Sequence, residues 1–306
     1  MPILGIIASQ NYPRITVFTK FLLAGGNTSA GQKTVSLYNI AADTYTAKTD
    51  MTQDGGEYPG GGYYNGDAYV FGGTSSNAFK YNYAYSVTGN SWTSKTDMTA
   101  GRCELTYTTY QNKFYAFGGK ASGSNQTRVE VYYYDPVANS WTQVADMPNN
   151  KGSGVAGVIG SKIYVNGGYR NPPLPEAGTK LTYEYDVTAN TWTTVADSTY
   201  VHARNPGTNA SDGTYLYAIG STEYSSNNQA EKYDPVSNTW SDITDATNSI
   251  ADNYSPFFCA NDGKLYVATG YAQSATQVYT ISSNSWTGKS GTPSIGFTRP
   301  ALVGIP

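Results

Sequence analysis

Apolar and polar residues alternate with a period of two in short stretches along the chain, as in Lys162-Ile163-Tyr164-Val165 and Lys264-Leu265-Tyr266-Val267. This period predicts half-buried β-strands. Turn-forming pairs stand before such stretches: Asn65-Gly66, Gln111-Asn112, Gly160-Ser161, Asp212-Gly213 and Asp262-Gly263. Pairs of this kind join the two strands of a hairpin. The pattern therefore predicts an all-β chain of short antiparallel strands.

The predicted strands fall into six copies of one unit, each marked by an aromatic residue that opens its last strand. The markers are Tyr45, Trp92, Trp141, Trp192, Trp240 and Trp286. Subtracting their residue numbers gives intervals of 47, 49, 51, 48 and 46 residues. Glycine pairs keep the same step at Gly25-Gly26, Gly72-Gly73, Gly118-Gly119 and Gly167-Gly168, and decay to Gly220-Ser221 and Thr269-Gly270. A strand-rich repeat of about fifty residues predicts a β-propeller.

The glycine pair, a following Tyr-Asp pair such as Tyr134-Asp135, and the Trp marker together resemble the kelch repeat over nearly the whole chain. The resemblance implies a six-bladed kelch-type propeller with four-stranded antiparallel blades. Residues 300–305 resemble the innermost strand of the other units, and the first unit lacks a full copy of that strand. We expect this C-terminal strand to join blade one and close the ring. Residues 14–306 would then form the propeller, with residues 1–13 as an N-terminal arm or a segment that covers a sheet edge.

Several repeated residues have structural roles in this scheme. Each aromatic marker is expected to fill the space between two blades. One position of the turn before the marker is always asparagine in the last five units: Asn90, Asn139, Asn190, Asn238 and Asn284. We expect a left-handed backbone conformation there, because asparagine tolerates it best after glycine.

Composition narrows the function classes. Charged residues make up 13% of the chain and the net charge is -3, and Lys and Arg are not clustered, which argues against general nucleic-acid binding. No apolar run is long enough to span a membrane, so membrane insertion is not expected. The two cysteines, Cys103 and Cys259, lie three units apart in a ring of six, so we expect unpaired buried thiols.

The N-terminal ten residues carry a second resemblance. Met1-Pro2-Ile3-Leu4-Gly5-Ile6-Ile7-Ala8-Ser9-Gln10 is similar to the opening of many tailed-bacteriophage virion and tail-appendage proteins. The resemblance implies a virion location, with other virion proteins as partners. The alternative interpretation is an apolar strand that covers a sheet edge, and a cytoplasmic location stays open beside the virion.

Function is most expected on the face that carries the loops after the glycine pairs and the connections between blades, because these segments vary in length. The longest lie in blades four and five. They bring together the ligand-binding candidates Tyr169, Arg170, Glu176, Tyr200, His202, Arg204, Glu223 and Tyr224. Aromatic rings beside adaptable polar groups suit a sugar or a protein partner. Arg102, Lys151, Arg204 and Arg299 are expected to begin comparable strands, as structural residues or as a ring that attracts an anion.

The sequence lacks the motifs of common catalytic and metal sites. His202 is the single histidine, so a His-rich metal site within one chain is impossible, and no zinc-spaced Cys and His set appears. We expect no cofactor and no enzymatic activity. The predicted function is a binding or adhesion module, a phage tail or capsid appendage protein that recognises a host surface glycan or a partner protein. Two alternatives stay open: a kelch-type sugar mutarotase that uses His202, Arg204 and Glu223, and a soluble protein-interaction scaffold.

Overall fold

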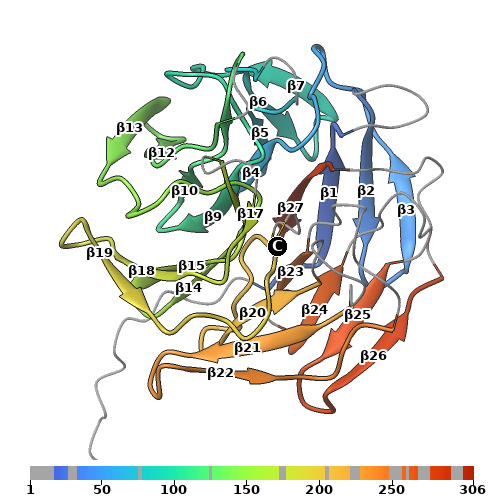
Figure 1. Ribbon diagram of the computed structural model, residues 1–306. Coiled ribbons are helices and arrows are strands. Elements are labelled where there is room, and N and C mark those ends of the chain that lie inside the picture. Colours follow the sequence, from blue (N-terminus) through green and yellow to red (C-terminus); the bar gives the residue numbers. More distant parts are fainter. Residues whose placement is uncertain are drawn as a thin grey trace, which may run out of the picture.

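The computed structural model describes residues 17–26, 33–74, 78–123, 126–171, 177–203, 207–220, 228–247, 257–259, 262–267, 276–290 and 299–306. Its strands form six antiparallel sheets arranged as blades around one axis (Figure 1). The predicted all-β, six-bladed propeller is therefore confirmed. Among the described residues, no helix is long and apolar enough to cross a membrane.

Each blade is a meander whose first strand lies nearest the axis. Blade one contains β27 (Ala301–Ile305), β1 (Lys20–Ala24), β2 (Val35–Asn39) and β3 (Thr44–Ala47). Blade two contains β4 (Gly60–Tyr64), β5 (Asp67–Phe71), β6 (Asn82–Ser86) and β7 (Ser91–Ser94). Blade three contains β9 (Thr106–Tyr110), β10 (Lys113–Phe117), β12 (Val131–Asp135) and β13 (Ser140–Val144). Blade four contains β14 (Val155–Ile159), β15 (Lys162–Asn166), β18 (Thr182–Asp186) and β19 (Thr191–Val195). Blade five contains β20 (Leu216–Ile219), β21 (Ala230–Asp234) and β22 (Thr239–Asp242). Blade six contains β23 (Phe257–Cys259), β24 (Lys264–Val267), β25 (Gln277–Thr280) and β26 (Ser285–Gly288). Two short pairs lie outside the blades, β8 (Arg102–Cys103) with β11 (Lys120–Ala121) and β16 (Tyr169–Arg170) with β17 (Ala177–Gly178).

The C-terminal strand closes the ring, as predicted. β27 pairs antiparallel with β1, with Leu22 opposite Val303, so the two ends of the described chain share blade one (Figure 1). Inner strands of different blades also meet at the axis. The Tyr107 hydroxyl on β9 accepts the Leu302 amide (3.0 Å) and donates to the Leu302 carbonyl (3.3 Å). Gly61 lets the inner strand β4 approach β27 closely, because a Cβ there would collide with Val303.

Blade five departs from the regular pattern. Its named strands number three, and its innermost segment, residues 207–211, is joined to β20 by an isolated bridge between Ser211 and Leu216. The same segment runs parallel to β14 of blade four, where the Ala156 amide donates to the Gly207 carbonyl (2.8 Å). The innermost segment of blade five is thus shared between two blades.

A repeated set of hydrogen bonds fastens each blade to the one before it. In blade three, Asn139 has a φ of 50°, and its Oδ1 accepts the Tyr134 hydroxyl (2.6 Å) and the amide of Thr96 in blade two (2.9 Å). The Trp141 Nε1 donates to the carbonyl of the same Thr96 (3.0 Å). We call this set the blade clasp.

The full blade clasp recurs in blades two to six, and blade one has a variant of it. The left-handed asparagines have φ values of 49°, 50°, 55°, 53° and 47° at Asn90, Asn139, Asn190, Asn238 and Asn284, so the predicted conformation is confirmed. Each of them accepts a Tyr hydroxyl from its own blade and an amide from the preceding blade. In blade one Asp43 replaces asparagine, accepting the Tyr38 hydroxyl and the Ser290 amide, and Tyr45 replaces tryptophan.

Candidate functional site

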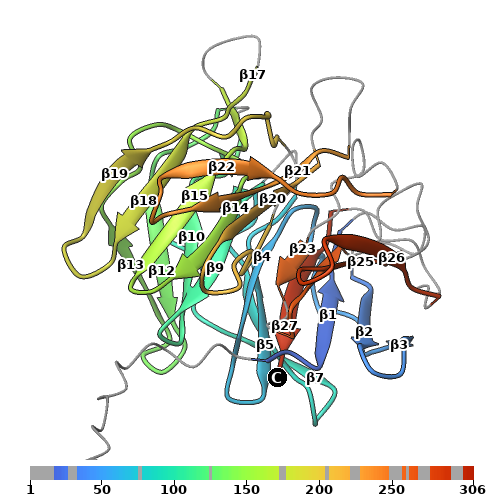
Figure 2. The ribbon, with the colours of Figure 1, turned by 90° about the horizontal axis from the view of Figure 1, so that it is seen from below.

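The face with the variable loops, here called the loop face, begins where the second strand of each blade ends in its glycine pair. β17, which pairs with β16, lies on this face, near the top of the view in Figure 2. Gly73, Gly119 and Gly168 all have positive φ, which glycine adopts at little cost. Their amides donate, each at 2.8 Å, to the carbonyls of Arg102, Lys151 and His202. These three basic residues therefore occupy one equivalent position, where the chain enters blades three, four and five.

This register differs from the expected one. The Tyr58 amide donates to the Arg299 carbonyl (2.8 Å), and the Glu104 amide donates to the Tyr58 carbonyl (3.1 Å). All three residues have positive φ, so Arg299, Tyr58 and Glu104 occupy equivalent positions in their blades. In blade three this position is Glu104, two residues after Arg102. The expectation that Arg299 begins a strand at the same position as Arg102 is wrong. His202 takes that place in blade five, and Arg204 lies outside the described residues.

Two arginines and one glutamate form a charged cluster on blade three. The Arg102 Nη2 lies 3.6 Å from Glu130 Oε2, and its Nη1 donates to the Gly101 carbonyl. Burial lowers the pKa of Arg102, and the nearby positive charge of Arg128 lowers it further, while Glu130 opposes both. The Nε atoms of Arg102 and Arg128 are buried and find no hydrogen-bond partner among the described residues. The Arg102 guanidinium group thus lies near both Glu130 and Arg128, so the cluster holds two positive charges and one negative charge.

An aromatic column on blade two borders this arginine cluster. Phe79, Tyr81 and Tyr83 follow one another at every second position, with ring centroids 5.1 and 6.0 Å apart. Tyr81 is 37% exposed. The column touches blade three directly, because the Arg102 amide donates to the Phe79 carbonyl (3.2 Å). The exposed Tyr81 ring and the buried Arg102 side chain therefore belong to adjoining segments of the loop face.

The positions in blade three that correspond to this column carry a different type of side chain. Tyr81 and Glu130 hold equivalent positions, since each carbonyl accepts the amide of the first glycine of its own blade's pair, Gly72 or Gly118. Phe79 is thereby equivalent to Arg128. The equivalent column therefore carries aromatic rings in blade two and charged side chains in blade three.

Tyr169, a predicted ligand-binding residue, lies in a buried polar centre between blades three and four. Its hydroxyl donates to Glu104, and the Lys120 Nζ lies 3.1 Å from the same carboxylate and 4.9 Å from the Tyr169 ring centroid. Tyr169 and Glu104 are almost fully buried. These contacts hold β11 against β16.

Arg170, the next predicted residue, lies at the edge of blade four. Its Nη2 donates to Asn149 Oδ1 (3.0 Å), and Asn149 in turn donates to the Tyr183 hydroxyl (2.8 Å). The Lys151 Nζ lies beneath, over the Tyr183 ring at 4.5 Å from its centroid, and donates to the Leu181 carbonyl. Lys151 is fully buried, and that burial lowers its pKa to about 7.

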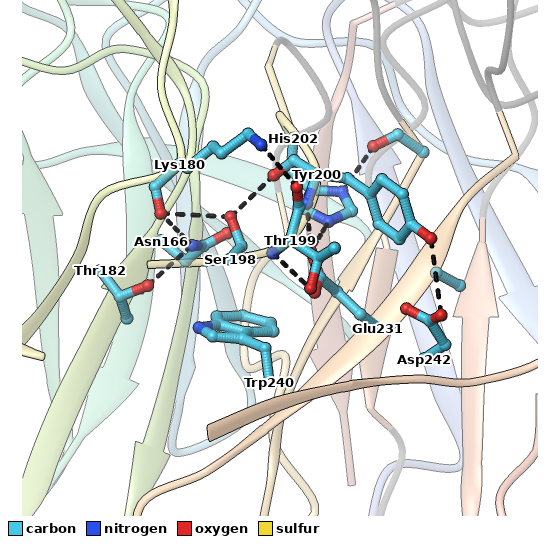
Figure 3. A network of polar contacts seen from close by, with 12 residues as sticks. Asn166, Lys180, Thr182, Ser198, Thr199, Tyr200, His202, Glu231, Trp240 and Asp242 are labelled. Atoms are coloured by element: carbon cyan, nitrogen blue, oxygen red, sulfur yellow. Dashed lines mark hydrogen bonds and ion pairs between the residues drawn. The ribbon is translucent and has the colours of Figure 1, made fainter. Parts of the chain in front are cut away.

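Tyr200 and His202 lie on the connection from blade four to blade five (Figure 3). His202 is fully buried, with its Nδ1 2.7 Å from the Gly220 carbonyl and its Nε2 2.8 Å from Glu231 Oε1. Tyr200 lies nearer the surface, and its hydroxyl donates to Asp242 (3.5 Å). The two rings meet edge to face, with centroids 6.5 Å apart.

The predicted site residues thus separate into three groups of contacts, around Glu104, around Asn149 and around Glu231. Four other candidates lie outside the described residues: Glu176, Arg204, Glu223 and Tyr224. Residues of interest that the sequence interpretation missed are Glu104, Glu130, Arg128 and Glu231. Glu231 had a usable signal, since the equivalent position is tyrosine in three other blades, namely Tyr83, Tyr132 and Tyr183. Within the described part of the chain, no three His, Cys, Asp or Glu side chains gather closely enough to hold a metal ion.

Comparison with known proteins agrees with this architecture. A family model described as the KLHDC2/KLHL20/DRC7 Kelch-repeats domain matches residues 62–270. Kelch-like protein 25 of Xenopus tropicalis is 30% identical over 109 residues, which is 35% of this chain and 17% of that protein. Kelch-like protein terF of Aspergillus terreus is 32% identical over 103 residues, which is 31% of this chain and 21% of that protein. The matched stretches therefore span about a fifth of these relatives' own lengths.

A solved structure shares the fold. The chain described as "Structure of YjhT" superposes with a TM-score of 0.71 at 14% sequence identity, covering 90% of this chain and 98% of that one. At this level of identity the likeness concerns the fold alone.

Proposed function

The chain belongs to the kelch-repeat family of β-propellers, and we propose that it is a non-enzymatic binding module that takes a protein partner on the loop face of blades two and three. The observation that carries the proposal is the arginine cluster, in which the Arg102 guanidinium group is paired with Glu130 and also feels the positive charge of Arg128. An acidic side chain or a C-terminal carboxylate of the partner would neutralise the remaining charge. Guanidinium groups bind carboxylates in a defined, often bidentate geometry.

The neighbouring aromatic column supplies the apolar part of the proposed contact. Tyr81 is exposed, and the rings of Phe79 and Tyr83 lie next to it at aromatic contact distances. Tyrosine gives a large amphipathic contact area with little loss of side-chain entropy, which is why it is enriched in binding surfaces. We therefore expect the partner to place an apolar side chain over Tyr81 and a carboxylate near Arg128.

The test is selection of a displayed random-peptide library on the intact chain, followed by titration of one recovered peptide. We expect acidic peptides whose binding weakens at least ten-fold in Arg128→Gln and in Tyr81→Ala. The control is Lys113→Gln, which removes one positive charge at the start of β10, on the opposite face of the same blade. It should bind as wild type does.

Other results would overturn the proposal. Loss of binding in Arg170→Gln with Arg128→Gln unaffected would favour the predicted site on blades four and five. Selective binding to a glycan array, with no peptide recovered, would favour the predicted glycan adhesin. Turnover of a sugar anomer would favour the mutarotase alternative.

The virion location stays a separate prediction. It rests on the resemblance of Met1 to Gln10, and residues 1–16 lie outside the described part of the chain. Mass spectrometry of purified phage particles tests it, and absence of the chain from every particle would contradict it.

A further inference from the structure

His202 links blades four and five through its backbone carbonyl and its imidazole ring (Figure 3). Its own carbonyl accepts the Gly168 amide of blade four at 2.8 Å. Its ring faces blade five, with Nδ1 at the Gly220 carbonyl and Nε2 at Glu231 Oε1. A single residue therefore spans the seam between blades four and five.

The hydrogen-bond partners determine where the ring protons lie. A backbone carbonyl accepts hydrogen bonds and cannot donate, so Nδ1 carries a proton. Glu231 also receives two amides, with Oε1 accepting Tyr200 N–H and Oε2 accepting Thr199 N–H, each at 3.0 Å. An ionised carboxylate is the form that accepts all these bonds, so Nε2 carries a proton as well. The arrangement is a buried imidazolium–carboxylate pair.

The surroundings of the pair are consistent with this ionisation. Burial alone would raise the pKa of Glu231, but the hydrogen bond and charge of His202, followed by the Tyr200 and Thr199 amides, hold that pKa below its ordinary value. Tyr200 is the other titratable side chain seen at the ring, edge-on, and Asp242 and Asp245 act on the Tyr200 hydroxyl. Among the described residues, no other charged side chain forms an ion pair or a hydrogen bond with His202 or Glu231.

The strand contacts at this seam differ from those of the other blades. The innermost segment of blade five bonds to β14 through Gly207 and Ala210, and it joins β20 through the bridge between Ser211 and Leu216 and the Tyr217 amide. The equivalent positions in blades three and four hold Arg102 and Lys151, whose partners are Glu130 and the Leu181 carbonyl. Blade five alone among these three uses a titratable imidazole against a buried carboxylate.

We propose that the His202–Glu231 pair is a pH-dependent lock on the seam between blades four and five. Loss of the second ring proton would leave two lone pairs facing each other at Nε2 and Oε1, and the seam would loosen. The lock holds the connection that presents Tyr200, so it would adjust this part of the loop face to pH. This inference does not depend on the proposed partner site on blades two and three.

Because His202 is the single histidine of the chain, nuclear magnetic resonance can follow it without assignment ambiguity. In the uniformly ¹⁵N-labelled full chain at pH 7, we expect both ring nitrogens to be protonated. In Glu231→Gln, we expect a neutral ring that keeps the proton on Nδ1, toward Gly220. A neutral ring in the wild-type chain at pH 7 would overturn the proposal.

Amide hydrogen exchange then tests the lock itself. When the pH rises far enough to remove the second ring proton, protection of the Gly168 and Thr199 amides should fall at least ten-fold after correction for intrinsic exchange. The Gly73 amide, which donates to the Arg102 carbonyl at another seam, serves as the internal control and should not change. In His202→Gln the pH dependence should vanish. Equal loss of protection at Gly73 and Gly168 would contradict the proposal.

Discussion

The blade clasp yields a prediction whose size can be worked out from the structure. Asn139→Ala removes the side-chain oxygen that accepts two hydrogen bonds. The half-buried bond from the Tyr134 hydroxyl contributes about 1 kcal/mol, and the exposed bond from the Thr96 amide contributes about 0.5 kcal/mol. It also places an alanine at a φ of 50°, which adds about 1 kcal/mol. We expect the free energy of unfolding to fall by about 2.5 kcal/mol.

Two further substitutions separate these contributions. Asn139→Gly loses the hydrogen bonds but not the favourable backbone conformation, so it should cost about 1.5 kcal/mol. Asn139→Asp keeps an acceptor and should stay within about 0.5 kcal/mol of wild type, because Asp43 already fills this position in blade one. The assay is urea unfolding followed by tryptophan fluorescence. Equal losses for Ala and Gly would refute the backbone contribution, and a loss for Asp as large as that for Ala would refute the hydrogen-bond contribution.

Two other predictions concern the interior. Tyr107→Phe strands the buried Leu302 amide, so chemical denaturation should show a loss of about 2 kcal/mol, and an unchanged midpoint would contradict the contact across the axis. Lys151 has a folded-state pKa of about 7 against an ordinary value near 10.4, so between these values the unfolded state binds more protons. Stability should therefore rise from pH 7 to 9, by up to about 1.4 kcal/mol per pH unit, and this slope should disappear in Lys151→Met.

Most of the fold could be predicted because the repeat markers encode local requirements. Positive φ favours glycine or asparagine, and the space between blades favours a large aromatic ring, so Gly168, Asn139 and Trp141 reveal the unit directly in the sequence. Ring closure followed from the missing inner strand of blade one. These constraints act within one unit or between neighbours, where sequence spacing is informative.

The remaining features depend on partners that are distant in sequence. The shared inner segment of blade five exists because Gly207 meets Ala156 across a blade boundary, and no repeat marker records that contact. The register of Arg299 follows from backbone bonds to Tyr58 rather than from spacing, because the connections between blades differ in length.

The candidate site was predicted on the loop face, but spacing could not identify its contacts. Tyr169 and His202 were selected as loop residues, and the structure gives each of them a buried carboxylate partner, Glu104 and Glu231. Neither glutamate belongs to a marker. The arginine cluster on blade three escaped notice for the same reason, since Arg128 and Glu130 lie in a column whose residue type changes from blade to blade.

The most direct test of the proposed partner site is the dissociation constant of a selected acidic peptide for Glu130→Gln and Arg128→Gln. In the proposed site, Glu130 competes with the partner's carboxylate for the Arg102 guanidinium group. Removing its charge should therefore tighten binding several-fold, whereas Arg128→Gln should weaken it at least ten-fold. If both variants weaken binding, or if neither changes it, the arginine cluster is not the site that takes the partner.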